Sequence, residues 1–323
     1  MTATPRRFPV RPAEVFGLDP LAPALRQCKL ALLGDPHSPK SRWGPSSLRI
    51  FKPRVGVPLW LGRPRADRRV VITQLPNRVP PPPDAAYSVR ATFARDYRGR
   101  RLSYDGHVGT DFAIPPGTAV VAPAAGLVRL VENRMERGGL KVALDHGDGL
   151  ATTLGHLARA LVQPGDRVAR GDVVGLSGMS GVDGVLFFPW LAPHVHMNVL
   201  LDGAPVDPFA APGETPIWRA GNHPLPAPAP ALEDAAHPTT WDHDAIDATL
   251  ATCRDPVTRA EIEALTDPDD RAFRLMIRRL FRGYLFTAPP RRLTARAHAR
   301  RPRLDLPFAA RDYDGVLYVD GEE

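Results

Sequence analysis

The chain has 323 residues, which is long enough for two or three domains and for at least one core of ordinary size. Its 42 lysines and arginines outnumber 35 acidic residues and give a formal net charge of +7. This charge favours anionic partners, but no nucleic-acid-binding motif accompanies it, so we expect no nucleic-acid partner. Two cysteines, Cys28 and Cys253, are too few for a disulfide framework or a thiolate metal site.

The N-terminal segment is basic but shows no secretion signal. Arg26 and Lys29 interrupt the best apolar run, residues 21–33, so no uninterrupted hydrophobic region follows the basic start. No stretch of the sequence is long and apolar enough to predict a transmembrane segment.

Residues 1–85 form a proline-rich region for which the sequence indicates no role. Short β-branched or aromatic clusters at 55–61 and 69–75 predict short strands in it. Four consecutive prolines, Pro80 to Pro83, end the region and are typical of a stiff, extended spacer.

Residues 86–211 carry short apolar segments separated by turn signals. Glycine-rich turns such as Gly147-Asp148-Gly149 separate the segments, and no long helical period is present. The expected strands are 120–121, 127–131, 140–144, 150–154, 173–176 and 195–201. This pattern predicts a mainly β domain, built as an antiparallel barrel or sandwich.

The remaining sequence divides into a linker and a helical region. Residues 212–238 are rich in proline and predict a linker. Residues 239–323 change to a helical period, with helices expected at 242–253, 258–265 and 268–286 and with Asp242, Thr258 and Asp267 as caps. We therefore expect a small helical C-terminal appendage.

Histidines and an aspartate with metal-ligand spacing lie inside the β region. His194 and His196 are two residues apart in an expected strand, so both imidazoles project from one face. His107 and Asp111 are four apart and share a face if their segment is extended, which Gly109 favours over a helix. Imidazole and carboxylate suit zinc, and a catalytic zinc typically has three protein ligands and one open position.

The order of these residues resembles the lysostaphin and LytM type of zinc endopeptidases, which cut peptide bonds in bacterial peptidoglycan. The resemblance covers about residues 100–210. It is carried by His107-Val-Gly-Thr-Asp111, Gly117-Thr118-Ala119-Val120, Gly126-Leu127-Val128, Gly155-His156-Leu157, the turn from Gly165 to Gly171, and His194-Val-His196. It implies a folded antiparallel sheet of the duplicated-hybrid or barrel-sandwich kind.

The resemblance also implies the roles of the site residues. His107, Asp111 and His196 would bind one zinc per chain, and His156 and His194 would be catalytic histidines that do not bind the metal. The implied reaction is hydrolysis of peptide bonds in peptidoglycan cross-links or stem peptides by a zinc-activated water, assisted by the two histidines. A cell-envelope or extracellular location would follow, although no signal peptide is visible; the oligomeric state and the bond cleaved stay open.

Two other classes of function remain as alternatives. The motif Gly165-Asp-x-Val-x-x-Gly171 also occurs in biotinyl and lipoyl carrier domains and in a phosphocarrier protein. Those proteins lack the full set of histidines and aspartate described above. A non-catalytic regulatory or binding module on the same fold is the other alternative. His146 lies in a tight turn and is expected to be structural.

The sequence departs from the resembled family at two places. Leu154 stands where an aromatic residue is usual, and residues 182–192 are inserted before His194. Trp190 in this insertion is a candidate wall of the substrate groove, the alternative being that its apolar residues fill the core.

Overall fold

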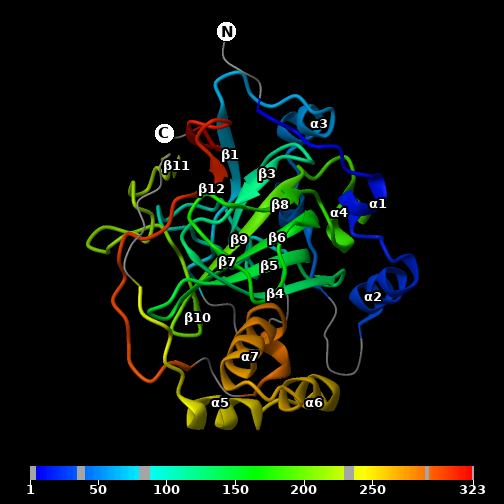
Figure 1. Ribbon diagram of the computed structural model, residues 1–323. Coiled ribbons are helices and arrows are strands. Elements are labelled where there is room, and N and C mark those ends of the chain that lie inside the picture. Colours follow the sequence, from blue (N-terminus) through cyan, green and yellow to red (C-terminus); the bar gives the residue numbers. More distant parts are fainter. Residues whose placement is uncertain (1–4, 35–40, 80–87, 229–235, 288–290, 322–323) are drawn as a thin grey trace.

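The computed structural model describes residues 5–34, 41–79, 88–228, 236–287 and 291–321. In this part of the chain, an 11-stranded sheet dominates the fold, and its longest path runs β13-β1-β2-β9-β6-β5-β4-β7 (Figure 1). The strands on this path are β13 Gly315–Tyr318, β1 Arg69–Gln74, β2 Thr110–Ala113, β9 His194–Leu201, β6 Leu150–Ala160, β5 Gly139–Asp145, β4 Gly126–Arg134 and β7 Arg167–Val168. Strand β10 (Ala204–Val206) pairs with β9, and β8 (Val173–Ser177) pairs with β3 (Ala119–Val121) and β6.

Antiparallel pairing holds most of this sheet together. The pairs β2–β9, β6–β9, β5–β6 and β4–β5 are all antiparallel, whereas β1 pairs with β13 in parallel. All six strands expected between residues 120 and 201 are present, and the predicted mainly β fold is confirmed. Side chains such as Ile72, Phe112, Leu154 and Trp218 are buried in the main core beside the sheet.

The N-terminal residues form short helices and one strand. The helices are α1 Pro12–Phe16, α2 Leu21–Leu33, η1 Pro45–Ile50 and α3 Pro53–Trp60. The strand expected at 69–75 is confirmed as β1, but the one expected at 55–61 is wrong, because α3 occupies it. Pro53 is favourable at the first helical position, and Val55 and Leu59, four residues apart, pack together in a small core cluster. The proline run at 80–83 lies outside the described residues.

Three helices pack together on one side of the sheet (Figure 1). They are α5 His243–Leu250, α6 Pro256–Glu263 and α7 Pro268–Arg282, followed by the 3-10 turn η2 Gly283–Leu285. They confirm the three predicted helices and bury a second apolar core that includes Ile246, Ile262 and Phe273. Asp242 and Asp267 cap α5 and α7 as expected, but the cap of α6 is Asp255 and not Thr258.

The C-terminal residues return to the sheets, which the sequence pattern did not predict. Strand β12 (Leu306–Ala309) pairs with β11 (Pro226–Ala227), and β13 joins the main sheet beside β1. The four-segment division of the chain stays a prediction. Among the described helices, none has the length and apolar character needed to cross a membrane.

Candidate metal centre

The five histidine and aspartate residues singled out by the sequence lie together on neighbouring strands. Asp111 on β2 is paired with His196 on β9, and His196 is in turn paired with Gly155 on β6, next to His156. His107 precedes β2, and His194 begins β9. Two groups among them could hold a metal ion: His107, Asp111 and His196, and His156, His194 and His196.

The carboxylate of Asp111 lies among three imidazoles. Its Oδ1 atom is 2.6 Å from His196 Nδ1, 3.2 Å from His107 Nε2 and 3.5 Å from His194 Nε2. Burial alone would raise the pKa of Asp111, but the neighbouring His194, His107 and His196 lower it well below its usual value. The carboxylate is therefore ionised and available as a metal ligand at neutral pH.

Backbone carbonyls fix the orientation of three of the imidazoles. His107 Nδ1 is 2.9 Å from the Leu75 oxygen, His156 Nδ1 is 2.6 Å from the Ser180 oxygen, and His194 Nδ1 is 2.9 Å from the Ala192 oxygen. A carbonyl only accepts hydrogen bonds, so each Nδ1 carries the proton and donates it. In each neutral ring, Nε2 is left with a free lone pair, which is the arrangement that metal-binding histidines commonly show.

The contact between His107 and Asp111 indicates that these residues suit a cation. His107 Nε2 and Asp111 Oδ1 are both acceptors when the imidazole is neutral, yet they face each other at 3.2 Å. Burial would lower the pKa of His107, but the Asp111 charge and two hydrogen bonds outweigh it and raise this pKa. The arrangement thus needs positive charge between the two atoms, which a proton or a metal ion supplies.

Asn198 is a site residue that the sequence motifs did not single out. Its Nδ2 is 3.0 Å from His196 Nε2, and its Oδ1 accepts a hydrogen bond of 2.8 Å from Thr153 Oγ1. Asn198 follows His196 by two residues on β9, so both side chains project from the same face of the strand. That even spacing was the signal in the sequence that could have identified it.

Burial keeps His156 neutral. Its pKa lies well below the usual value, first because the ring is buried and then because His194 and His196 lie close by. The His156 and His194 rings are 4.7 Å apart, and the His156 and His196 rings are 6.0 Å apart. A neutral imidazole in this position can accept a proton from a group bound beside it.

Gly109 leaves room for the imidazole of His196. A Cβ atom at Gly109 would lie 2.5 Å from His196 Nε2 and 2.8 Å from Asn198 Nδ2, closer than real Cβ atoms come. Any larger residue would displace one of these side chains. The glycine between His107 and Asp111 is therefore required by the close approach of β9.

The inserted segment before His194 has exposed apolar side chains at Val185, Leu186, Phe188 and Trp190. It contains helix α4, Val182–Phe187, and Trp190 is 58% exposed. Phe187 packs against Trp43 and Phe51 of the N-terminal region. Trp190 is not part of the core, which leaves the groove-wall interpretation of this residue in place.

His146 makes its contacts outside the metal centre. Its Nδ1 is 2.8 Å from the Ala125 oxygen and its Nε2 is 2.8 Å from Thr152 Oγ1, so the ring links a turn to β6. The turn from Gly165 to Gly171 lies between β6 and β8 and includes β7.

Part of the chain that contains the centre is similar to known proteins. Residues 105–208 match the model of peptidase family M23. The peptidoglycan DD-endopeptidase ShyA of Vibrio cholerae is 38% identical over 106 residues, 32% of this chain and 23% of that protein. The DD-carboxypeptidase/endopeptidase Mpg of Neisseria meningitidis serogroup B is 33% identical over 110 residues, 34% of this chain and 24% of that protein. The chain thus spans about a quarter of the length of these curated relatives.

Solved structures of two related proteins were also matched. A zinc-containing peptidase from Vibrio cholerae is 28% identical, with a TM-score of 0.31 over 44% of this chain and 38% of that chain. The catalytic domain of lysostaphin from Staphylococcus simulans is 29% identical, with a TM-score of 0.28 over 32% of this chain and 77% of that chain. The family match and the His/Asp groups confirm the zinc cofactor predicted from the sequence. The similarity to peptidase family M23 covers residues 105–208 of this chain.

Proposed function

We propose that this chain is a zinc-dependent endopeptidase that hydrolyses peptide bonds in peptidoglycan. The observation that carries the proposal is the convergence of His107, Asp111 and His196 beside two further imidazoles, those of His156 and His194. Of the curated relatives named above, ShyA is a peptidoglycan DD-endopeptidase and Mpg a DD-carboxypeptidase/endopeptidase, which supports a peptidoglycan peptide as the substrate.

The donor set supports His107, Asp111 and His196 as the residues that hold zinc. This group includes the ionised carboxylate, whereas the alternative group of three histidines leaves Asp111 without a role. Bound zinc supplies a Lewis acid, which polarises a scissile carbonyl and lowers the pKa of water to about 7. Rotation of the Asn198 amide by 180° would let its oxygen accept a hydrogen bond from a protonated His196 Nε2 and leave Nδ1 free for the metal.

His156 and His194 are proposed to handle protons and charge during hydrolysis. Both donate Nδ1–H to a backbone carbonyl, so both present Nε2. A neutral Nε2 accepts the proton of an attacking water and returns it to the departing amine, and a protonated one stabilises a developing oxyanion.

Digestion of purified peptidoglycan by the zinc-loaded chain tests this function. We expect soluble products whose masses, read by mass spectrometry, show cleavage within peptides and not between sugars. Asp111→Ala should give no products, while His243→Ala, at an exposed histidine on α5, should match the unaltered chain. Zinc-loaded, folded protein that releases no peptide fragment would contradict the proposal and favour a non-catalytic module.

A further inference from the structure

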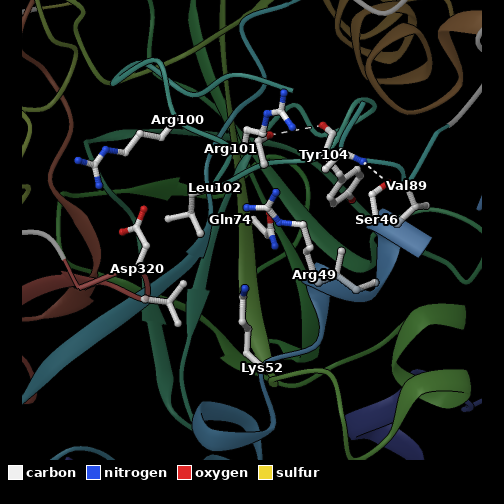
Figure 2. Close-up of a pocket in the computed structure, with 14 residues that line it drawn as sticks. Ser46, Arg49, Lys52, Gln74, Val89, Arg100, Arg101, Leu102, Tyr104 and Asp320 are labelled. Atoms are coloured by element: carbon white, nitrogen blue, oxygen red, sulfur yellow. Dashed lines mark hydrogen bonds between the residues drawn. The ribbon is translucent and has the colours of Figure 1, made fainter. Parts of the chain in front are cut away.

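The structure contains a basic pocket of about 210 Å³. Figure 2 shows the residues that line it. Arg49, Lys52, Gln74, Arg101 and Tyr104 are among the residues that line it. Its volume corresponds to about seven water molecules at about 30 Å³ each, which is smaller than the pockets that enclose drug-sized ligands. The space suits a group of about one amino-acid residue.

The sheet connects this pocket directly to the proposed zinc ligands. Gln74 on β1 is paired with Asp111 on β2, and Asp111 is paired with His196 on β9. A register shift between Ile72 and Gln74 leaves Gln74 as the β1 residue that lies opposite Asp111. On the other side, the Tyr104 ring lies 4.7 Å from the ring of His107.

The pocket carries an excess of positive charge. Within the described residues, the side chains of Arg49, Lys52 and Arg101 make no hydrogen bond or ion pair. Asp320 is the acidic residue in the lining, and its carboxylate is already paired with Arg98 at 2.8 Å. Asp320 also interacts electrostatically with Lys52, but the cations in the lining outnumber this single carboxylate, so the pocket favours an anionic group as the occupant.

The side-chain oxygen of Gln74 can accept a hydrogen bond from an occupant of the pocket. This residue is only 6% exposed, and its Oε1 atom has no partner among the described residues. A buried carbonyl oxygen without a donor is costly, so an occupant that brings an N–H group gains free energy by pairing with it. A peptide that carries a carboxylate supplies both the amide donor and the anion.

We propose that the basic pocket is a substrate subsite that binds a carboxylate of the peptide, at a residue next to the scissile bond. Lys52 and Arg49 bind the carboxylate, and Gln74 Oε1 accepts a hydrogen bond from a peptide N–H. The inference rests on the proposed endopeptidase function and adds the chemistry of the substrate. Arg49, Lys52 and Gln74 lie before the family segment 105–208, so the subsite belongs to the flanking sequence of this chain.

Kinetics with three synthetic stem peptides test the subsite. One peptide has all its carboxylates free, the second is amidated at its C-terminus, and the third is amidated at its internal carboxylate. Lys52→Gln and Arg49→Gln together should raise KM for the free peptide about tenfold, with kcat within about twofold. The amidated peptide that already lacks the recognised carboxylate should be insensitive to the two substitutions, which identifies the terminal or the internal carboxylate as the ligand.

Two control variants separate the pocket from general charge effects. Arg54 lies on α3, close in sequence to Lys52, but it is exposed and does not line the pocket. Arg54→Gln therefore removes a nearby cation and should leave KM unchanged. Lys52→Arg keeps the charge in the pocket and should retain most of the affinity for the free peptide. A rise in KM for Arg54→Gln as large as that for the pocket substitutions would trace the effect to overall charge and overturn the subsite.

Equilibrium binding distinguishes failure of the subsite from failure of the proposed function. If the unaltered chain cleaves none of the peptides, the endopeptidase proposal fails. Calorimetric titration then tests the subsite separately, because it measures the affinity for each peptide without cleavage. The free peptide should bind at least about fivefold more tightly than one of the amidated peptides, and the Lys52→Gln, Arg49→Gln variant should lose that difference. Equal KM and equal affinity for all three peptides would likewise overturn the subsite.

Discussion

Asp111 and His196 lie directly opposite each other on β2 and β9, with Asp111 Oδ1 2.6 Å from His196 Nδ1. Cross-strand pairing thus brings together two residues that are 85 positions apart in the chain. Because the backbone of two paired strands sets this geometry, the proposed ligands are held in place before a metal binds. Such preorganisation reduces the cost of assembling the site.

Removing a proposed ligand should abolish metal binding. We expect Asp111→Ala and His196→Ala each to reduce zinc from about one ion per chain to a small fraction, because a catalytic site has only three protein ligands. Metal analysis of the purified variants by mass spectrometry measures this, with His243→Ala as the control. Full zinc occupancy in both variants would show that the ligands have been assigned wrongly.

The two remaining histidines should be needed for turnover and not for zinc. His194→Ala and His156→Asn should retain the metal and lose activity by about a hundredfold or more. Asparagine is chosen at position 156 because the His156 backbone has a positive φ of 58°, which asparagine tolerates better than alanine. Zinc content and peptide release are measured on the same samples. Loss of zinc from either variant would make that histidine a ligand.

The five candidate site residues could be singled out from the sequence because their signals are local. His194 and His196 share a strand, and the short glycine-separated segments indicated the sheet. Gln74 and its pocket could not be found in this way, since they depend on which distant strand pairs with β2. The helix α3 was missed because apolar clusters of this length suit a strand or a helix equally.

Trp190 should affect substrate binding more than stability. It is 58% exposed, so we expect Trp190→Ala to change the free energy of unfolding by less than about 1 kcal/mol and to raise KM a few-fold. Trp218→Ala is the contrast, because Trp218 is fully buried and its truncation should cost roughly 3 to 5 kcal/mol. Thermal unfolding and peptide-cleavage kinetics measure both effects. A large loss of stability with unchanged KM in Trp190→Ala would contradict the hypothesis that Trp190 forms a wall of the substrate groove.

His146 should make the fold sensitive to acid. Burial, with smaller effects from Arg303 and Arg170, lowers the pKa of His146 to about 4, whereas an unfolded histidine has its usual value of 6.5. Between these values the unfolded chain binds more protons, so the stability that His146 contributes is present above pH 6.5 and lost as the pH falls to about 4. The loss amounts to about 3 kcal/mol.

The variant His146→Gln should remove this part of the pH dependence. Denaturant unfolding at several pH values between about 4 and 7 gives the slope for each protein, and His243→Gln, at an exposed histidine, is the control. The control should retain the slope of the unaltered chain. An unchanged slope in His146→Gln would mean that other groups cause the acid sensitivity.

The pairing of β1 with both β2 and β13 has a consequence for any attempt to isolate the peptidase segment. A fragment cut to residues 105–208 would lose β1 and expose the backbone of β2 as an open edge. Open edges recruit strands from other molecules, so such a fragment should be prone to aggregate. It would also lose Leu75, whose carbonyl oxygen orients His107. We therefore expect that a stably folded fragment must extend beyond the matched segment 105–208 and include β1.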